Sequence, residues 1–243
     1  MTKPRTSPRG KRDQGPRKRR QVLLVVSAVV VAVFVVVILV VLSGENEPEL
    51  EPLALEGDVQ IPSGVTADGD VFLGMPDAPV TVIEYSDYFC GHCRDFAAEN
   101  APKLEDEFIA TGKVRWVIPY YALGKDARLS VVEATACAAD QGRFFEYRRL
   151  LFANQRQLGQ TPIDQWRSLL IDYAQQVGLE VGTFEQCWDQ GVHQAEILAS
   201  IDKAWQQGMT STPRFLINGQ LIVGNQPYQV FQQAIQEALA TSQ

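Results

Sequence analysis

Two cysteines separated by two residues carry the clearest chemistry in this 243-residue sequence, in the motif Cys90-Gly91-His92-Cys93. An alternating apolar stretch, 80–85, precedes the motif and is typical of a strand, and helical spacing follows it, so Cys90 should lie at a helix N-terminus. Free backbone N–H groups and the positive end of the helix dipole stabilise a thiolate there. Cys93, one turn later, can form a disulfide with Cys90 and resolve a mixed disulfide. The pattern predicts thiol–disulfide exchange.

The motif has two other interpretations, a zinc site and a structural disulfide. A zinc site normally requires four ligands, and the sequence offers only His92, Cys137, Cys187 and His193 in addition, with no second Cys-x-x-Cys and no His pair. A purely structural disulfide of this spacing would constrain very little chain. We therefore favour redox chemistry at Cys90 and Cys93, with no metal and no cofactor.

The first 42 residues predict a membrane anchor. Residues 1–20 carry nine Lys or Arg and one acid, and 22–42 carry no charge. A helix over 22–42 would be about 30 Å long, the thickness of a hydrocarbon core. The run is too long and uniform for a signal-peptide core, although cleavage after it is the alternative. The positive-inside rule then places the basic tail, 1–21, in the cytoplasm and the catalytic part outside, in a single-pass protein of the cell membrane.

Charge and cysteine content restrict the partners of the exported part. The basic tail contributes +8 to a total formal charge of −7, so the rest of the chain carries −15. Such an acidic domain is not expected to bind nucleic acid. Four cysteines in an exported domain suit an oxidising compartment.

The segment after the anchor begins with an acidic, Pro-containing linker over 43–70 and continues as an α/β domain. Its hairpin signal is Asn218-Gly219, and Pro102 should interrupt the helix that follows the cysteine motif. The patterns predict strands near 71–73, over 80–85, 113–119, 214–217 and 220–223, and helices from 90, over 126–139, 143–153, 163–177, 184–188 and 193–207, and from 227.

Three segments, 74–81, 84–90 and 208–219, give the sequence a resemblance to the DsbA-like thiol–disulfide oxidoreductases of the thioredoxin superfamily. The resemblance covers roughly 71–240. It implies a thioredoxin fold, over 71–124 and 209–243, that is interrupted by a helical insertion over 125–208. One position departs from the family: Gly91 stands where a proline is frequent. The resulting Gly-His dipeptide is found in protein disulfide isomerases, so the choice between oxidase and isomerase stays open.

Cys90 is the expected nucleophile, and the neighbouring His92 should stabilise its thiolate. Glu84 is an acid within an apolar strand, where an ionised carboxylate is costly unless it is paired or its pKa is raised. The resemblance implies that Glu84 is a buried proton acceptor for Cys93. The alternative is that Glu84 faces solvent at a strand end or pairs with a lysine.

Thr212-Pro213 precedes the hairpin. The resemblance implies that Pro213 is cis and packs against the active-site disulfide, and that Thr212 offers its backbone to an extended substrate. An ordinary turn proline is the alternative.

Cys137 and Cys187 lie in the helical insertion. Pairing them is one of three connectivities, and the only one that leaves Cys90 and Cys93 free to cycle. We expect a structural disulfide. A second redox relay is the alternative, although it lacks a Cys-x-x-Cys context.

The function expected from the sequence is that of a membrane-tethered dithiol oxidase that passes its disulfide to reduced exported proteins and assists their folding. The resemblance implies that a quinone-linked membrane partner reoxidises it. An isomerase or reductase with the same site is the enzymatic alternative. A non-catalytic thioredoxin-like module that binds a partner or a metal through its thiols is the alternative from another class.

Overall fold

The computed structural model describes residues 61–242. The expected basic tail, the anchor over 22–42 and most of the linker lie outside these residues. Within 61–242, no helix is both long enough and apolar enough to span a bilayer.

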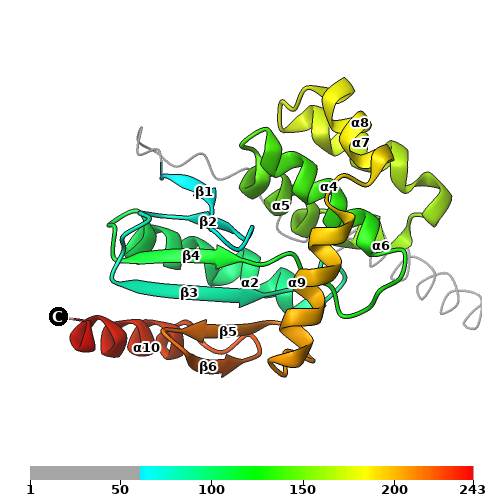
Figure 1. Ribbon diagram of the computed structural model, residues 1–243. Coiled ribbons are helices and arrows are strands. Elements are labelled where there is room, and N and C mark those ends of the chain that lie inside the picture. Colours follow the sequence, from blue (N-terminus) through cyan, green and yellow to red (C-terminus); the bar gives the residue numbers. More distant parts are fainter. Residues whose placement is uncertain (1–60, 243) are drawn as a thin grey trace, which may run out of the picture. The chain divides into compact units, whose positions relative to one another are not determined.

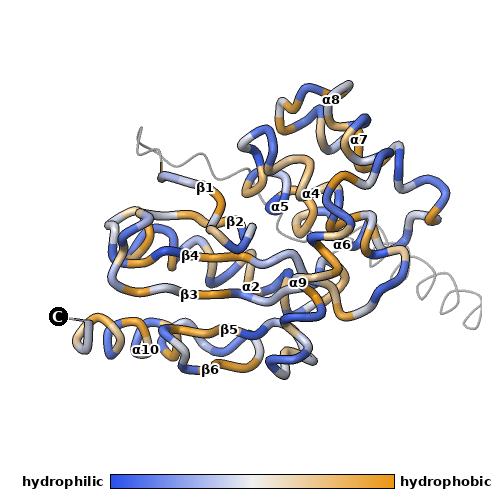
Figure 2. Tube along the Cα trace, in the orientation of Figure 1, coloured by the Kyte–Doolittle hydropathy of each residue, from blue (hydrophilic) through white to orange (hydrophobic). Residues whose placement is uncertain are grey.

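A six-stranded sheet forms the centre of the described domain, with strand order β1-β2-β4-β3-β5-β6 (Figure 1). The strands are β1 Ser63–Val65, β2 Val71–Leu73, β3 Val80–Tyr85, β4 Val114–Ile118, β5 Arg214–Ile217 and β6 Gln220–Val223. Only β3 and β4 are parallel; the other neighbours are antiparallel. Hydrophobic residues line β3, β4 and β5 (Figure 2), as expected for strands in the interior of a sheet.

The helices divide into those of the sheet domain and those of the insertion. The sheet domain contains α2 Gly91–Glu99, α3 Ala101–Leu104, the π-helical turn η1 Glu105–Ile109 and the C-terminal α10 Tyr228–Thr241. The insertion contains α4 Leu129–Asp140, α5 Phe144–Ala153, α6 Gln155–Gln160, the 3-10 turn η2 Ile163–Gln165, α7 Trp166–Gln176, α8 Val181–Gln190 and α9 Gln194–Gln206. A thioredoxin-like fold with a helical insertion was predicted, and it is confirmed.

One face of the sheet is packed against α2 and α10 through aromatic side chains. Phe96 of α2 contacts Phe215 of β5, with ring centroids 4.4 Å apart, and Phe231 of α10 at 5.4 Å. It also contacts Trp116 of β4 edge to face at 6.3 Å. In the strand register, Glu84 lies opposite Phe215. Glu84 therefore points into this aromatic layer, on the buried side of β3.

The domain begins earlier than the sequence patterns indicated. Strand β1, Ser63–Val65, lies inside the range assigned to the linker, and it pairs with β2 through Gly64 opposite Phe72. Three residues are too short to give a recognisable alternation, so pairing with β2 rather than local propensity defines this strand. The linker prediction is wrong for this part, and 43–60 lie outside the described residues.

The helix boundaries in the insertion also differ from the predicted ones. The helix expected over 126–139 begins only at Leu129, because the Asp126 carboxylate accepts the Arg128 N–H at 3.0 Å and holds a turn before it. The helix expected over 184–188 extends to Val181–Gln190 and ends at Gly191, whose φ of 59° is left-handed. Pro102 does mark a break, between α2 and α3.

A disulfide joins Cys137 of α4 to Cys187 of α8, and their Cα atoms are 5.8 Å apart. It closes a segment with a sequence separation of 50 residues. Replacing both cysteines with serine should lower the free energy of unfolding by up to about 4 kcal/mol, because the unfolded chain regains the loop entropy. Chemical denaturation of the parent and the double variant measures this difference. An unchanged midpoint would contradict a structural role for the disulfide.

Candidate functional site

The cysteine motif lies at the start of α2, where the sequence pattern predicted it. Cys90 is the N-cap residue, and its carbonyl accepts the N–H groups of Cys93 and Arg94 at 3.1 and 3.2 Å. Both thiols are free. Cys90 is partly exposed, whereas Cys93 is fully buried, with 0% of its surface exposed. Only Cys90 is therefore accessible to a substrate.

The two thiols differ strongly in acidity. Hydrogen bonding from the Cys93 thiol lowers the pKa of Cys90 to about 5, helped by Thr212 and by the backbone N–H groups of His92 and Cys93, and these effects outweigh the desolvation of the thiolate. Burial raises the pKa of Cys93 well above its ordinary value, and the hydrogen bond to Cys90 adds to this rise. Cys90 is thus suited to be the attacked and leaving sulfur, and Cys93 the internal partner.

The loop before β5 approaches the same sulfur. The peptide bond between Thr212 and Pro213 is cis, and the Thr212 carbonyl accepts the Cys90 thiol at 3.5 Å. The structure thus brings the predicted loop next to the predicted nucleophile. The role of Thr212 in holding a substrate stays a prediction.

Glu84 is fully buried, and its neighbour is an arginine of the insertion. Oε1 of Glu84 accepts a hydrogen bond from Nη2 of Arg148 at 2.5 Å, and both side chains are at most 3% exposed. Burial raises the pKa of the Glu84 carboxyl, and the charge of Arg148 opposes this rise. In the described chain, Glu84 forms no hydrogen bond with Cys93, and its Oε2 has no partner. Its predicted role as proton acceptor therefore stays a prediction.

His92 is exposed, and its side chain has no hydrogen-bond partner within 61–242. What the structure shows acting on Cys90 is the backbone N–H of His92. A contribution from the imidazole also stays a prediction.

Two further residues support the motif. Asp87, 1% exposed, accepts the N–H groups of Phe89 at 2.7 Å and of Leu123 at 2.8 Å, and so fixes the loop that leads into Cys90. Gln155 of α6 donates to the Cys90 carbonyl at 2.9 Å. The insertion therefore helps to position the nucleophile rather than only covering the sheet.

Sequence signals for Arg148 and Gln155 are weak. At helical spacing, Arg148 lies on the same face of α5 as Phe144, Leu151 and Phe152. A positively charged side chain therefore lies within an apolar helix face. Such a residue requires a buried anion, and Glu84 was the one candidate acid in a core strand. Gln155 carries no comparable signal.

The low pKa of Cys90 leads to a measurable reactivity profile. Alkylation of the reduced protein by iodoacetamide should follow the thiolate fraction, with a midpoint near pH 5 and a plateau above it. The Cys90→Ala variant is the control, since the buried Cys93 should not react. A midpoint near pH 8.5, the value of a free thiol, would contradict the proposed activation.

Comparisons with known proteins agree with this geometry. The model of the family described as thioredoxin matches residues 66–237. Disulfide bond formation protein D of Bacillus subtilis is 26% identical, with 70% of this chain and 78% of the relative covered. The crystal structure of oxidised BdbD from Bacillus subtilis superimposes with a TM-score of 0.65 at 23% identity, covering 74% of this chain and 99% of that one.

A second group of relatives has a different name. A Na(+)/H(+) antiporter NhaA of Salinispora tropica is 29% identical over 78% of this chain. This chain spans only 28% of that antiporter's length. The shared part is therefore a segment of a longer protein.

Proposed function

This chain belongs to the thioredoxin family, and from this premise we propose that it is a thiol–disulfide oxidoreductase of the DsbA type that donates the Cys90–Cys93 disulfide to reduced proteins. The observation that carries the proposal is the asymmetry of the two thiols. Cys90 is accessible and has a pKa of about 5, and Cys93 is buried with a raised pKa. A stabilised thiolate favours the dithiol form, which makes the disulfide form an oxidant.

The reaction follows from these positions. A substrate thiolate attacks Sγ of Cys90, the Cys90–Cys93 bond breaks, and Cys93 leaves and takes up a proton because its pKa is high. A second substrate thiolate then attacks the substrate sulfur of the mixed disulfide. Cys90 leaves readily as a thiolate, because a low leaving-group pKa speeds this step. The substrate gains a disulfide, and the protein accepts two electrons and becomes a dithiol.

The proposed location rests on the sequence alone. The uncharged run over 22–42 and the basic tail before it support an anchor with the described domain outside the cytoplasm. Reduced exported proteins are then the substrates, and a quinone-linked membrane protein is the proposed partner that restores the disulfide. The sequence likewise supports a thioredoxin-like domain over 71–124 and 209–243 and a helical insertion over 125–208. In the structure, β1 extends the sheet of the first domain back to Ser63.

The test is the reduction potential of the Cys90/Cys93 pair, measured by equilibration with glutathione with Cys137 and Cys187 in place. We expect a value of about −120 to −180 mV, the range of disulfide donors and isomerases. A value of about −250 mV or below would mean that the pair prefers to stay oxidised, and a reductase would replace the oxidase. The Gly91-His92 dipeptide makes an isomerase the second candidate. Reactivation of scrambled ribonuclease distinguishes the isomerase from the oxidase.

A further inference from the structure

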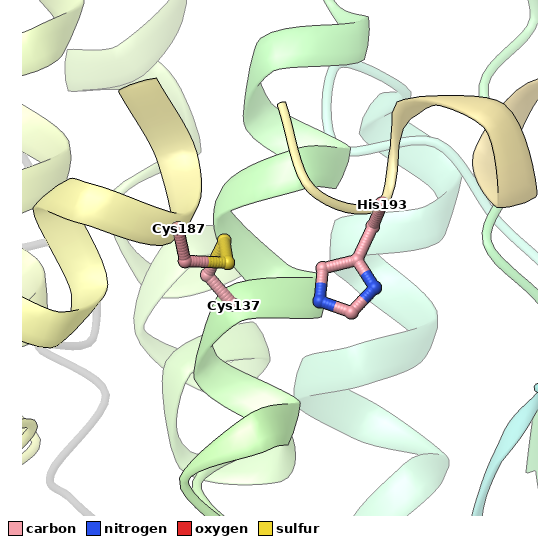
Figure 3. Close-up of side chains that lie close together, drawn as sticks. All are labelled: Cys137, Cys187 and His193. Carbon is pink, nitrogen blue, oxygen red and sulfur yellow. A yellow bond between two sulfur atoms is a disulfide. The ribbon is translucent and has the colours of Figure 1, made fainter. Parts of the chain in front are cut away.

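The two cysteines of the insertion's disulfide belong to the only group of three metal-ligating side chains found within 61–242, namely Cys137, Cys187 and His193 (Figure 3). One candidate ligand atom from each residue lies within 4.8 Å of the others. The three residues come from α4, α8 and the residue that precedes α9. This cluster is separate from Cys90 and Cys93 in the sequence and plays no part in the proposed exchange reaction.

A carboxylate lies next to two members of this cluster. Oδ2 of Asp140 lies 3.7 Å from Sγ of Cys187 and 2.8 Å from Nε2 of His193. Asp140 follows Cys137 by three residues on α4, so both side chains lie on one face of that helix. The same atom thus reaches both the sulfur and the imidazole.

The orientation of His193 is an independent observation. Nε2 is directed toward Asp140, while Nδ1 lies 3.3 Å from Oε2 of Glu196. Figure 3 shows one ring nitrogen on the side of the disulfide and the other directed away from it. The backbone N–H of His193 donates to Oε1 of buried Glu133 at 2.8 Å, which holds the residue in place. A carboxylate on the far ring nitrogen is the arrangement that orients metal-binding histidines.

We propose that reduction of the Cys137–Cys187 disulfide opens a four-ligand Zn²⁺ site made of Cys137, Cys187, His193 and Asp140. Two thiolates, one imidazole and one carboxylate are all common zinc ligands and complete a tetrahedral set. In the disulfide each sulfur is bonded to the other. With Zn–S bonds of about 2.3 Å, two zinc-bound sulfurs lie about 3.8 Å apart. Side-chain rotation at the ends of the released bond supplies this separation without movement of the helices.

The chemical step balances with a dithiol as reductant. The dithiol attacks one sulfur, and after a second exchange it leaves as a disulfide, while Cys137 and Cys187 each hold a proton. Zn²⁺ then displaces these two protons as it binds both thiolates. The oxidised protein offers only His193 and Asp140, and two ligands do not make a closed site. The cluster is therefore a metal site gated by the redox state of the insertion.

The experiment uses the full chain with Cys90→Ser and Cys93→Ser, which removes the other thiol pair and makes the result independent of the proposed activity. After reduction by dithiothreitol and its removal without oxygen, we expect one equivalent of Zn²⁺ by elemental analysis. Co²⁺ as a probe should give thiolate-to-metal charge transfer and the absorption of a tetrahedral site. The oxidised protein should bind neither metal with this signature.

Variants test the individual ligands. His193→Gln and Asp140→Asn should each weaken Co²⁺ binding at least tenfold, and replacing Cys137 and Cys187 with serine should abolish it. Asp172→Asn, at an exposed carboxylate of α7, is the matched control and should leave the affinity unchanged. Absence of stoichiometric binding, or equal binding by His193→Gln, would overturn the proposal.

Discussion

Replacing Arg148 with methionine is expected to lower the free energy of unfolding by about 3–5 kcal/mol, because it leaves the carboxyl of Glu84 buried without its charged partner. The guanidinium carbon of Arg148 also lies 5.0 and 4.9 Å from the ring centroids of Trp116 and Phe152, so these contacts are lost as well. Denaturation of the oxidised protein measures the change.

The pH dependence of this loss has a defined sign. Burial already raises the pKa of Glu84, and removing Arg148 takes away the charge that opposes the rise. A group whose pKa is higher in the folded state stabilises the fold below its unfolded pKa and loses that contribution as the pH rises. The deficit of Arg148→Met should therefore be smallest near pH 4 and grow toward neutrality.

Two variants decide whether the pair itself is responsible. Arg149→Met is the matched control, since Arg149 pairs with Glu105 at 2.5 Å but is 43% exposed, and it should cost less than about 1 kcal/mol. Combining Arg148→Met with Glu84→Leu removes both charges and should recover most of the stability. A single Arg148→Met variant as stable as the parent, or a double variant less stable than either single one, would refute this account.

The pattern of residues predicted the fold well where local signals were strong. The hairpin around Asn218-Gly219 has the predicted strands, because positive φ at Asn218 and Gly219 suits that dipeptide. Cys90 caps α2 as expected from the strand-to-helix change of period. β1 could not be predicted, since its three residues acquire strand geometry only by pairing with β2.

Within the candidate site, only the residues that belong to recognisable sequence motifs could be predicted. Cys90, Cys93 and the Thr212-Pro213 loop have motifs, and the structure brings all of them together. Gln155 reaches Cys90 across a sequence separation of 65 residues, and Arg148 reaches Glu84 across 64. Such contacts depend on how the insertion packs on the sheet, and packing leaves no short-range pattern in a single sequence.

The Cys93→Ala variant should retain attack by Cys90 but lose turnover in the oxidation of reduced ribonuclease by at least about a thousandfold, because it can no longer form the Cys90–Cys93 disulfide. Its Cys90 thiolate should still react with glutathione disulfide and remain as the mixed disulfide, which mass spectrometry detects. In the parent, Cys93 attacks Cys90 and releases glutathione.

Cys90→Ala provides the complementary test. Because Cys93 has 0% of its surface exposed, this variant should form no glutathione adduct at that thiol at neutral pH. The variant with Cys137→Ser and Cys187→Ser should turn over normally, which separates loss of the reacting pair from loss of stability. Adduct formation at Cys93 as fast as at Cys90 would show that the two thiols are equivalent. The assignment of Cys90 as nucleophile and Cys93 as internal partner would then fail, since it depends on their difference in exposure and acidity.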